Sequence, residues 1–355
     1  MKAIVWTGQL EVRDDVEVRD PRPNEVRVKI HAAGLCHSDV SVINGTIPFP
    51  TPVVMGHEGA GVVEAIGSGV TKVKVGDHVV LTTLGNCGQC AACDRGQPTF
   101  CRDTAGKLSA PFTVAGERAF QFANAGVFSE YTVVKETSAI VIDPEVPLAS
   151  ASLIGCAVLT GVGAVLNRAK SAPGQSAMVI GLGGIGLNVL QGLALSNAQP
   201  IIAIDTNPTK EAAAKLFGAT HFICAGEGVD TVAAVKEICP TGVDFAFECV
   251  GHPALIRTSI DALDWGGSCV LLGVPKFGSE ASFAVNTLYN DKSILGCRYG
   301  SARPHHDVKL FVELYKAGKL KLDELVSATY AVDDVQQALT DMHDGKLNRG
   351  VLTFV

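Results

Sequence analysis

Short runs in which apolar and polar residues alternate dominate the first 150 residues. Runs at 25–30, 61–66 and 78–82 are separated by glycine, proline and aspartate, which favour turns. Alternation with a period of two is typical of strands that bury one face. The pattern therefore predicts a compact β-rich domain with antiparallel or barrel-like strands.

From about residue 157 to 297 the pattern changes, and apolar strand-like runs alternate with helical ones. This order is typical of a doubly wound parallel sheet, so we expect an α/β protein. The region from 298 onward, with two helical stretches (307–317 and 333–344) and a closing strand (350–355), fits neither pattern. The strands expected in the parallel sheet are 178–180, 200–204, 221–223, 244–248, 269–272 and 293–295.

Composition narrows the class of protein. Hydrophobic residues make up 47% of the 355 and charged residues 18%, which is enough apolar surface for a sizeable core. The net charge is −7 and no basic run is present, which argues against a nucleic-acid partner. The apolar stretch near the start is too short for the core of a secretory signal, so we predict a cytoplasmic protein.

The segment 171–204 has no charged residue and is long enough to span a bilayer. It also holds six glycines and two prolines, and it divides into a strand, a turn, a helix and a second strand. We therefore expect no membrane segment here.

Four of the eleven cysteines, Cys87, Cys90, Cys93 and Cys101, form a C-x2-C-x2-C-x7-C cluster within the loop 86–102. Cytoplasmic thiols stay reduced, so clustered cysteines favour metal binding or catalysis over disulfides. Four thiolates can fill every position of a tetrahedral zinc ion, which predicts a structural zinc site. An iron–sulfur cluster and free thiols are the competing interpretations.

Three further candidate ligands are far apart in the sequence: Cys36 in GLCHSD, His57 in GHEGAGVVEAIGSGV, and Cys156 in LIGCAVLTG. Each alone is more typical of packing. Together, a Cys, His, Cys set leaves the fourth position of zinc open, as a catalytic zinc requires.

Gly181, Gly183 and Gly186 form a G-x-G-x-x-G pattern between an expected strand and an expected helix. This context is typical of a dinucleotide-binding turn, which brings a pyrophosphate to the positive end of the helix. Asp205 follows at the end of the next strand, where a carboxylate binds the ribose hydroxyls and disfavours NADP. Lys210 is either a second ribose contact or a solvated surface charge.

Seven motifs follow one another along the chain: the GHE-x2-G-x5-G-x2-V signature at 56–70, the four-cysteine loop, LIGC-x3-TG, GLGGIG with Asp205, GVDFAFECVG, LLGVP and RGVLTF. With them, the chain resembles the zinc-dependent medium-chain alcohol dehydrogenases over nearly its whole length. The resemblance implies a GroES-like β-rich catalytic domain, 1–156 with 298–355, and a Rossmann NAD-binding domain, 157–297. It also implies two zinc ions per chain.

The resemblance assigns the catalytic zinc to Cys36, His57 and Cys156. Glu58 would lie close behind the metal and exchange with water. Asp39 would orient His57, since metal-bound imidazoles usually donate their other N–H group. A purely fold-stabilising role for Glu58 and Asp39 is the alternative.

Ser38 matches the hydroxyl that takes the alcohol proton. Many family members carry a histidine five residues after the first zinc cysteine, but this chain has Ser41, so water or another residue must complete the relay. His37 matches a pyrophosphate contact. The resemblance places further cofactor contacts at Thr160, Gly184, Val274 and Arg349.

The substrate implied is a primary alcohol, oxidised to the aldehyde (and formed in reverse) by hydride transfer from a zinc-bound alkoxide to NAD. Thr83 stands where several relatives carry a bulky aromatic residue, so with Ile47 and the segment 108–112 it is expected to form a roomy apolar channel for medium-chain or aromatic alcohols. The alternatives are a glutathione-adduct dehydrogenase of the formaldehyde type, an aldehyde reductase, and, more remotely, a non-catalytic NAD-binding protein. A homodimer or homotetramer is expected, with the strand at 269–274 pairing across a two-fold axis.

Overall fold

The computed structural model describes residues 1–103 and 107–354, and these separate into two compact units. The β-rich unit comprises Met1–Cys156 and Arg303–Val355, and the α/β unit comprises Ala157–Ala302. The chain therefore returns to its first unit at residue 303, whereas the sequence suggested 298.

Two sheets form the framework of the β-rich unit. One has the strand order β2-β1-β5-β9-β8-β3, and the other has the order β11-β7-β6-β4-β19-β18, with β10 paired to β4. Most neighbours are antiparallel, as predicted, but β5 with β9 and β18 with β19 are parallel. The strands are β1 (Ala3–Trp6), β2 (Leu10–Arg13), β3 (Val16–Val18), β4 (Glu25–Gly34), β5 (Val53–Val54), β6 (Glu58–Ile66), β7 (His78–Leu81), β8 (Phe112–Val114), β9 (Glu117–Gln121), β10 (Tyr131–Lys135), β11 (Ala139–Val141), β18 (Val326–Ala331) and β19 (Arg349–Thr353).

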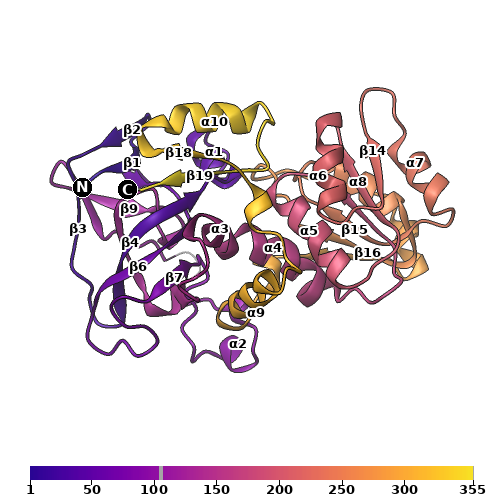
Figure 1. The fold of residues 1–355 in the computed structure, drawn as a ribbon. Helices are drawn as coiled ribbons and strands as arrows, with labels where there is room; N and C mark the ends of the chain where they lie inside the picture. Colours follow the sequence, from indigo (N-terminus) through magenta and orange to yellow (C-terminus); the bar gives the residue numbers. More distant parts are fainter. Residues whose placement is uncertain (104–106, 355) are drawn as a thin grey trace. The chain divides into compact units, whose positions relative to one another are not determined.

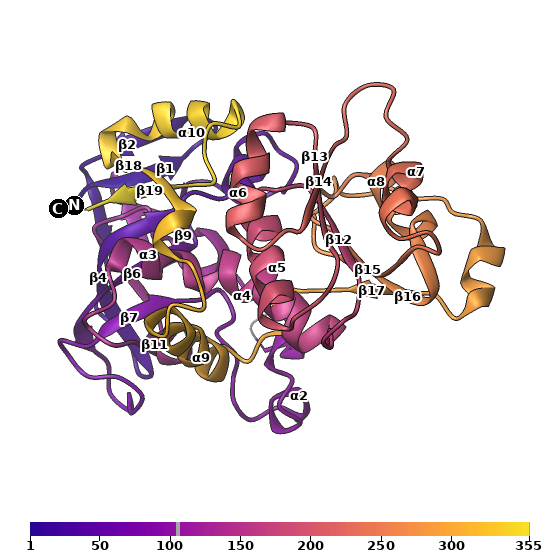
Figure 2. The ribbon, with the colours of Figure 1, turned by 45° about the vertical axis from the view of Figure 1, so that its right-hand side comes forward.

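Strand β4 follows the predicted alternation. Val26, Val28 and Ile30 are buried in the core, whereas Arg27 and Lys29 between them point away from it. Strand β4 pairs with β6, β10 and β19, and of these β6 and β19 lie far apart in the sequence. Figures 1 and 2 show β19, in yellow, beside the purple β4. The last segment of the chain thus completes the sheet that its first segment begins.

The α-helices of this unit within residues 1–103 and 107–354 are α1 (His37–Ile43), α2 (Ala91–Asp94), α3 (Leu148–Ser152), α9 (Pro304–Lys316) and α10 (Val335–His343). Proline at the first position of α9 and Asp307 in its first turn favour a helix start there.

The α/β unit is a six-stranded parallel sheet with the order β14-β13-β12-β15-β16-β17. Helices cover both of its faces (Figure 2), which explains why all four residues of β12 are buried. The order 3-2-1-4-5-6 defines the doubly wound dinucleotide-binding fold. The elements are α4 (Ala157–Gly163), β12 (Ala177–Ile180), α5 (Gly184–Leu195), β13 (Ile201–Asp205), α6 (Glu211–Leu216), β14 (His221–Cys224), α7 (Thr231–Ile238), β15 (Val243–Glu248), α8 (Pro253–Asp261), β16 (Leu263–Leu271) and β17 (Ser293–Gly296).

The expectation that the strand near 269–274 lies at the sheet edge is wrong. Strand β16 pairs with β15 on one side and with β17 on the other, so β17 is the outer strand. Ser293–Gly296 is short and its residues are only partly buried or exposed, which suits an edge position.

No single helix within the described residues is both long enough and apolar enough to cross a membrane; only the bent pair Leu148–Gly155 and Ala157–Ala169 meets the criteria when counted together.

Candidate active site

Cys36, His57, Glu58 and Cys156 converge in the interior of the β-rich unit. One ligand atom from each lies within 4.8 Å of the others, and all four residues are buried. Cys36 is the residue from which α1 begins, Glu58 is the first residue of β6, and Cys156 follows a short 3-10 turn after α3. Two sulfurs and a ring nitrogen are donors that suit zinc, so the set predicted from the sequence has a suitable composition for a zinc site.

Asp39 connects α1 to the histidine. Its Oδ1 atom lies 3.3 Å from His57 Nδ1 and accepts a hydrogen bond from the Gly56 N–H group at 3.2 Å, while Oδ2 accepts one from the Cys36 N–H group at 3.1 Å. With Nδ1 held by Asp39, the opposite ring nitrogen is left for a metal. The ring of Phe122 packs edge-on against His57 with 5.3 Å between ring centroids. Nothing in the sequence pattern pointed to Phe122.

The pKa values of the buried thiols and imidazole are shifted in different directions. A hydrogen bond from Cys156 holds the pKa of Cys36 well below its ordinary value, whereas the same bond and burial raise the pKa of Cys156. Burial alone would lower the pKa of His57, but the charges of Asp39 and Cys36 outweigh it and raise that pKa. The pair of thiols can therefore supply one thiolate readily, and metal binding must displace the second proton.

Glu58 forms a buried ion pair with Arg349 at the start of β19. Burial raises the pKa of Glu58 to about 7, although the guanidinium of Arg349 acts in the opposite direction. The second carboxylate oxygen of Glu58 has no hydrogen-bond partner in the described part of the chain. A Cβ at Gly34 would lie 2.7 Å from that oxygen and 2.6 Å from Leu153, so only glycine fits beside it.

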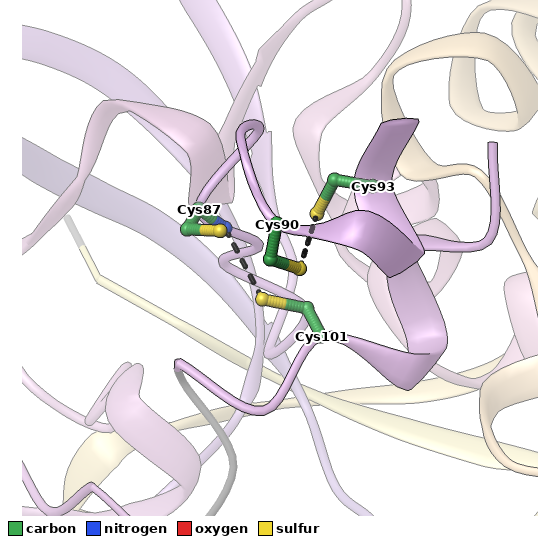
Figure 3. A group of neighbouring side chains, drawn as sticks. All are labelled: Cys87, Cys90, Cys93 and Cys101. Carbon is green, nitrogen blue, oxygen red and sulfur yellow. Dashed lines mark hydrogen bonds between the residues drawn. The ribbon is translucent and has the colours of Figure 1, made fainter. Parts of the chain in front are cut away.

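The four-cysteine loop forms a second group (Figure 3), and its sulfurs also lie within 4.8 Å of one another. Cys90 precedes the short helix α2, which carries Cys93, and Cys101 follows the 3-10 turn Pro98–Phe100. Burial opposes ionisation of Cys101, but N–H groups of Cys87 and Asp103 outweigh it and lower its pKa to about 6. Four sulfur donors fit a closed zinc site.

Each glycine of the turn between β12 and α5 has a different steric role. Gly181 has a φ of +89°, and a Cβ on Gly186 would lie 1.9 Å from the Gly181 carbonyl oxygen. A Cβ on Gly183, in contrast, would meet nothing within 4 Å. Gly183 also precedes α5 without a side-chain cap, so the first N–H groups of this helix have room for an anion.

Asp205 ends β13 beside this turn. One of its carboxylate oxygens accepts a hydrogen bond from the Leu182 N–H group at 2.8 Å, and the other accepts one from Asn207 at 2.9 Å. Lys210 is 9% exposed; burial lowers its pKa, and Asp205 partly offsets that effect. A buried lysine beside Asp205 argues against the interpretation of Lys210 as a solvated charge.

The remaining predicted residues are dispersed. Ser38 lies next to the metal set, with Oγ 3.8 Å from Cys36 Sγ. Thr83 lines a cavity of about 600 Å³ together with part of the segment 108–112, but Ile47 is not among the lining residues and packs against the apolar core instead. His37 is exposed in the first turn of α1, and Ser41 lies in the same helix. Thr160 is buried in α4, and Gly184 is the first residue of α5. Val274 is exposed.

Comparison with known proteins places this fold in a family. Residues 22–144 match the alcohol dehydrogenase GroES-like domain, and residues 184–317 match the zinc-binding dehydrogenase domain. The chain is similar to the S-(hydroxymethyl)glutathione dehydrogenase of Komagataella pastoris, with 36% identity over 99% of this chain and 97% of that protein. It is also similar to the class-3 alcohol dehydrogenase of Myxine glutinosa, with 37% identity over 99% and 96%.

A solved structure of similar fold supports the same family. Benzyl alcohol dehydrogenase from Acinetobacter calcoaceticus superposes with a TM-score of 0.93, at 35% identity, over 100% of this chain and 99% of that one. The chain belongs to the zinc-dependent medium-chain alcohol dehydrogenases, and the GroES-like and Rossmann assignments made from the sequence are confirmed.

Proposed function

We propose that the protein oxidises a primary alcohol to the aldehyde with NAD, and catalyses the reverse reduction, at the site formed by Cys36, His57 and Cys156. The observation that carries this proposal is that two thiols and an imidazole meet in a buried set, with the imidazole oriented by Asp39. A structural site would require a fourth protein sulfur or nitrogen, and this set instead has the carboxylate of Glu58, which Arg349 already engages.

When bound there, zinc supplies a Lewis acid that lowers the pKa of an alcohol. The chain's own residues hold the geometry: Asp39 fixes the tautomer and orientation of His57, and Arg349 keeps Glu58 paired. Ser38, part-buried and adjacent to Cys36, is positioned to accept the alcohol proton. Ser41 cannot serve as a base near neutral pH, so the proton leaves through water or another group.

The preference for NAD rests on Asp205. Its carboxylate is held at the end of β13 by two backbone N–H groups, where it can accept hydrogen bonds from ribose hydroxyls and repel a 2′-phosphate. The space in front of Gly183 suits the pyrophosphate.

A replacement of one ligand tests the site. Cys36→Ser should abolish turnover and remove one of two zinc ions per chain, while the circular dichroism spectrum stays unchanged. Cys239→Ser, which alters a buried cysteine of the α/β unit, is the matched control and should keep both zinc ions and activity. Full activity in Cys36→Ser would exclude this site.

A second candidate substrate is the thiol adduct S-(hydroxymethyl)glutathione, after which the similar dehydrogenase of Komagataella pastoris is named. Turnover of a panel of alcohols, with this adduct included, can be followed by NADH absorbance. A higher kcat/KM for the adduct than for hexanol or benzyl alcohol would favour the second candidate.

We further propose that the protein is a homodimer or homotetramer in which a second copy covers the outer strand β17 of the α/β unit. Apolar side chains in the segment that leads to this strand are strongly exposed: Phe277 by 92%, Val285 by 78% and Tyr289 by 90%. A patch of this kind beside an unpaired strand edge is typical of a subunit interface.

A further inference from the structure

We propose that the β-rich unit contains a second ligand site, separate from both cysteine groups, which binds a small molecule with two or more negative charges. The site is a cavity of about 600 Å³, which lies within the range of small-molecule pockets. None of the candidate zinc ligands is among its lining residues.

Segments distant in the sequence meet around this cavity. Arg19 and Arg22 come from the connection between β3 and β4, and Lys107 from the residues that precede β8. Arg118 lies on β9, and Lys135 ends β10. Five basic residues and one acidic residue, Glu25, thus line a single hollow.

Among the described residues, the acidic residue forms an ion pair with one of these cations and acts on the guanidinium of Arg22 only through its charge. Glu25 binds Arg19 through both of its oxygens, at 2.5 and 2.8 Å. Arg22, Lys107, Arg118 and Lys135 have no ion-pair partner among the residues that the structure describes; each is exposed in its own segment. Four like charges around one cavity repel one another, and a bound anion would relieve that repulsion.

Two polar atoms of the cavity wall are buried without a hydrogen-bond partner among the residues that the structure describes: Gln121 Oε1 and Thr83 Oγ1. Gln121 as a whole is only 1% exposed. Buried polar atoms are almost always hydrogen-bonded, so an unpaired amide oxygen and an unpaired hydroxyl on one wall indicate a missing polar partner. The hydroxyl can donate to an anion, and the amide can do so by rotating its NH₂ group toward it.

The wall is held in place before any ligand arrives. Asn124 has a left-handed backbone with a φ of 56°. Its side chain donates to the Lys107 carbonyl oxygen at 2.9 Å and accepts from the Ser109 N–H group at 3.0 Å. Ser109 in turn accepts from the Gln121 N–H group at 3.0 Å. Lys107 and Gln121 are therefore connected through one hydrogen-bonded loop, which lowers the ordering cost of binding.

The lining also fixes the class of ligand. Arginine binds carboxylate and phosphate oxygens in pairs, and lysine binds them as a point charge. The apolar residues Leu108, Ala110, Val133 and Val134 leave room for a carbon skeleton between the charged groups. A polycarboxylate or a phosphorylated metabolite meets both requirements, and their shared chemistry is that of a multivalent anion.

Isothermal titration calorimetry of the zinc-loaded protein, saturated with NAD, tests the proposal. The probes are tricarballylate and fructose 1,6-bisphosphate, with acetate at equal ionic strength as the monovalent reference. Arg22→Gln/Lys135→Gln removes two charges of the cavity, and Lys72→Gln/Lys74→Gln removes two exposed charges elsewhere in the same unit. All four positions are exposed, so both variants should fold.

We expect one site per chain for at least one probe, weakened at least tenfold in the cavity variant and unchanged in the control variant. The probe that binds more tightly identifies phosphate or carboxylate as the preferred group. The proposal is overturned if neither probe binds saturably up to roughly 10 mM. Equal weakening in both double variants would overturn it as well, because binding would then follow net charge alone.

Discussion

Removal of Arg349 should destabilise the β-rich unit through the carboxylate that it leaves behind. Arg349→Met keeps most of the side-chain length but leaves Glu58, which is fully buried, without its cation. Loss of one partner of a buried ion pair costs about 3–5 kcal/mol. Burial has already raised the pKa of Glu58 to about 7, so the unpaired carboxyl can take up a proton, which reduces the cost. We therefore expect the free energy of unfolding to fall by about 3 kcal/mol at pH 8.

The pH dependence follows from the sign of this shift. Without Arg349 the pKa of Glu58 rises further above its unfolded value, so the neutral form is favoured in the folded state. Protonation of Glu58 therefore stabilises the folded variant fully at pH values below the pKa that Glu58 has in the unfolded chain. This stabilisation is lost as the pH rises through the higher pKa of Glu58 in the folded state. The loss in free energy of unfolding that Arg349→Met causes relative to wild type should therefore be smaller at pH 6 than at pH 8.

Differential scanning calorimetry of the zinc-free protein measures this effect, and about 3 kcal/mol corresponds to a fall in Tm of roughly 6–12 °C. The double variant Glu58→Gln/Arg349→Met removes both charges and should recover most of the loss. Arg257→Met breaks an exposed helical pair with Asp261 and, as the control, should cost less than about 1 kcal/mol. A Tm for Arg349→Met within about 2 °C of wild type, or a double variant as unstable as the single one, would refute the reasoning.

Four further predictions can be checked independently. Cys90→Ser should bind one zinc ion fewer by elemental analysis and melt at lower temperature, and a normal zinc content would contradict a closed four-thiolate site. Asp205→Gly should narrow the preference for NAD over NADP in kcat/KM, and a wild type that prefers NADP would disprove the role of Asp205. Thr83→Phe should leave the ratio of kcat/KM for benzyl alcohol to that for ethanol unchanged, because Thr83 lines the basic cavity and not the zinc site, and a selective loss of benzyl alcohol turnover would place Thr83 in the substrate channel instead. Light scattering should give a multiple of the 37.0 kDa chain mass, and a monomer at micromolar concentration would exclude the proposed interface.

Local chemistry explains why much of the fold was accessible from the sequence. The glycines of the turn before α5 are required by backbone conformation and close approach, so their spacing is visible without any tertiary information. The same holds for Cys87 to Cys101, whose ligands lie on one loop. The alternation in β4 survives in the structure because one face of that strand meets the core.

Contacts between distant segments were not accessible in this way. Arg349 and Glu58 are 291 residues apart, and the resemblance suggested a phosphate contact for the arginine without its carboxylate partner. That phosphate contact stays a prediction. The basic cavity draws five charges from four segments, none of which forms a basic run. The position of β16 inside the sheet likewise depends on β17, whose pairing is set by tertiary packing.

The late return of the chain to its first unit has a consequence for synthesis. A ribosome completes the α/β unit, which is continuous from 157 to 302, before β19 exists. Until then β4 lacks one of its neighbours and Glu58 lacks its cation. The nascent β-rich part therefore has an open strand edge and an uncompensated buried acid, both of which favour aggregation or holding by a chaperone. Maturation of the metal site should consequently be a post-translational event, triggered when the segment after residue 303 inserts beside β4.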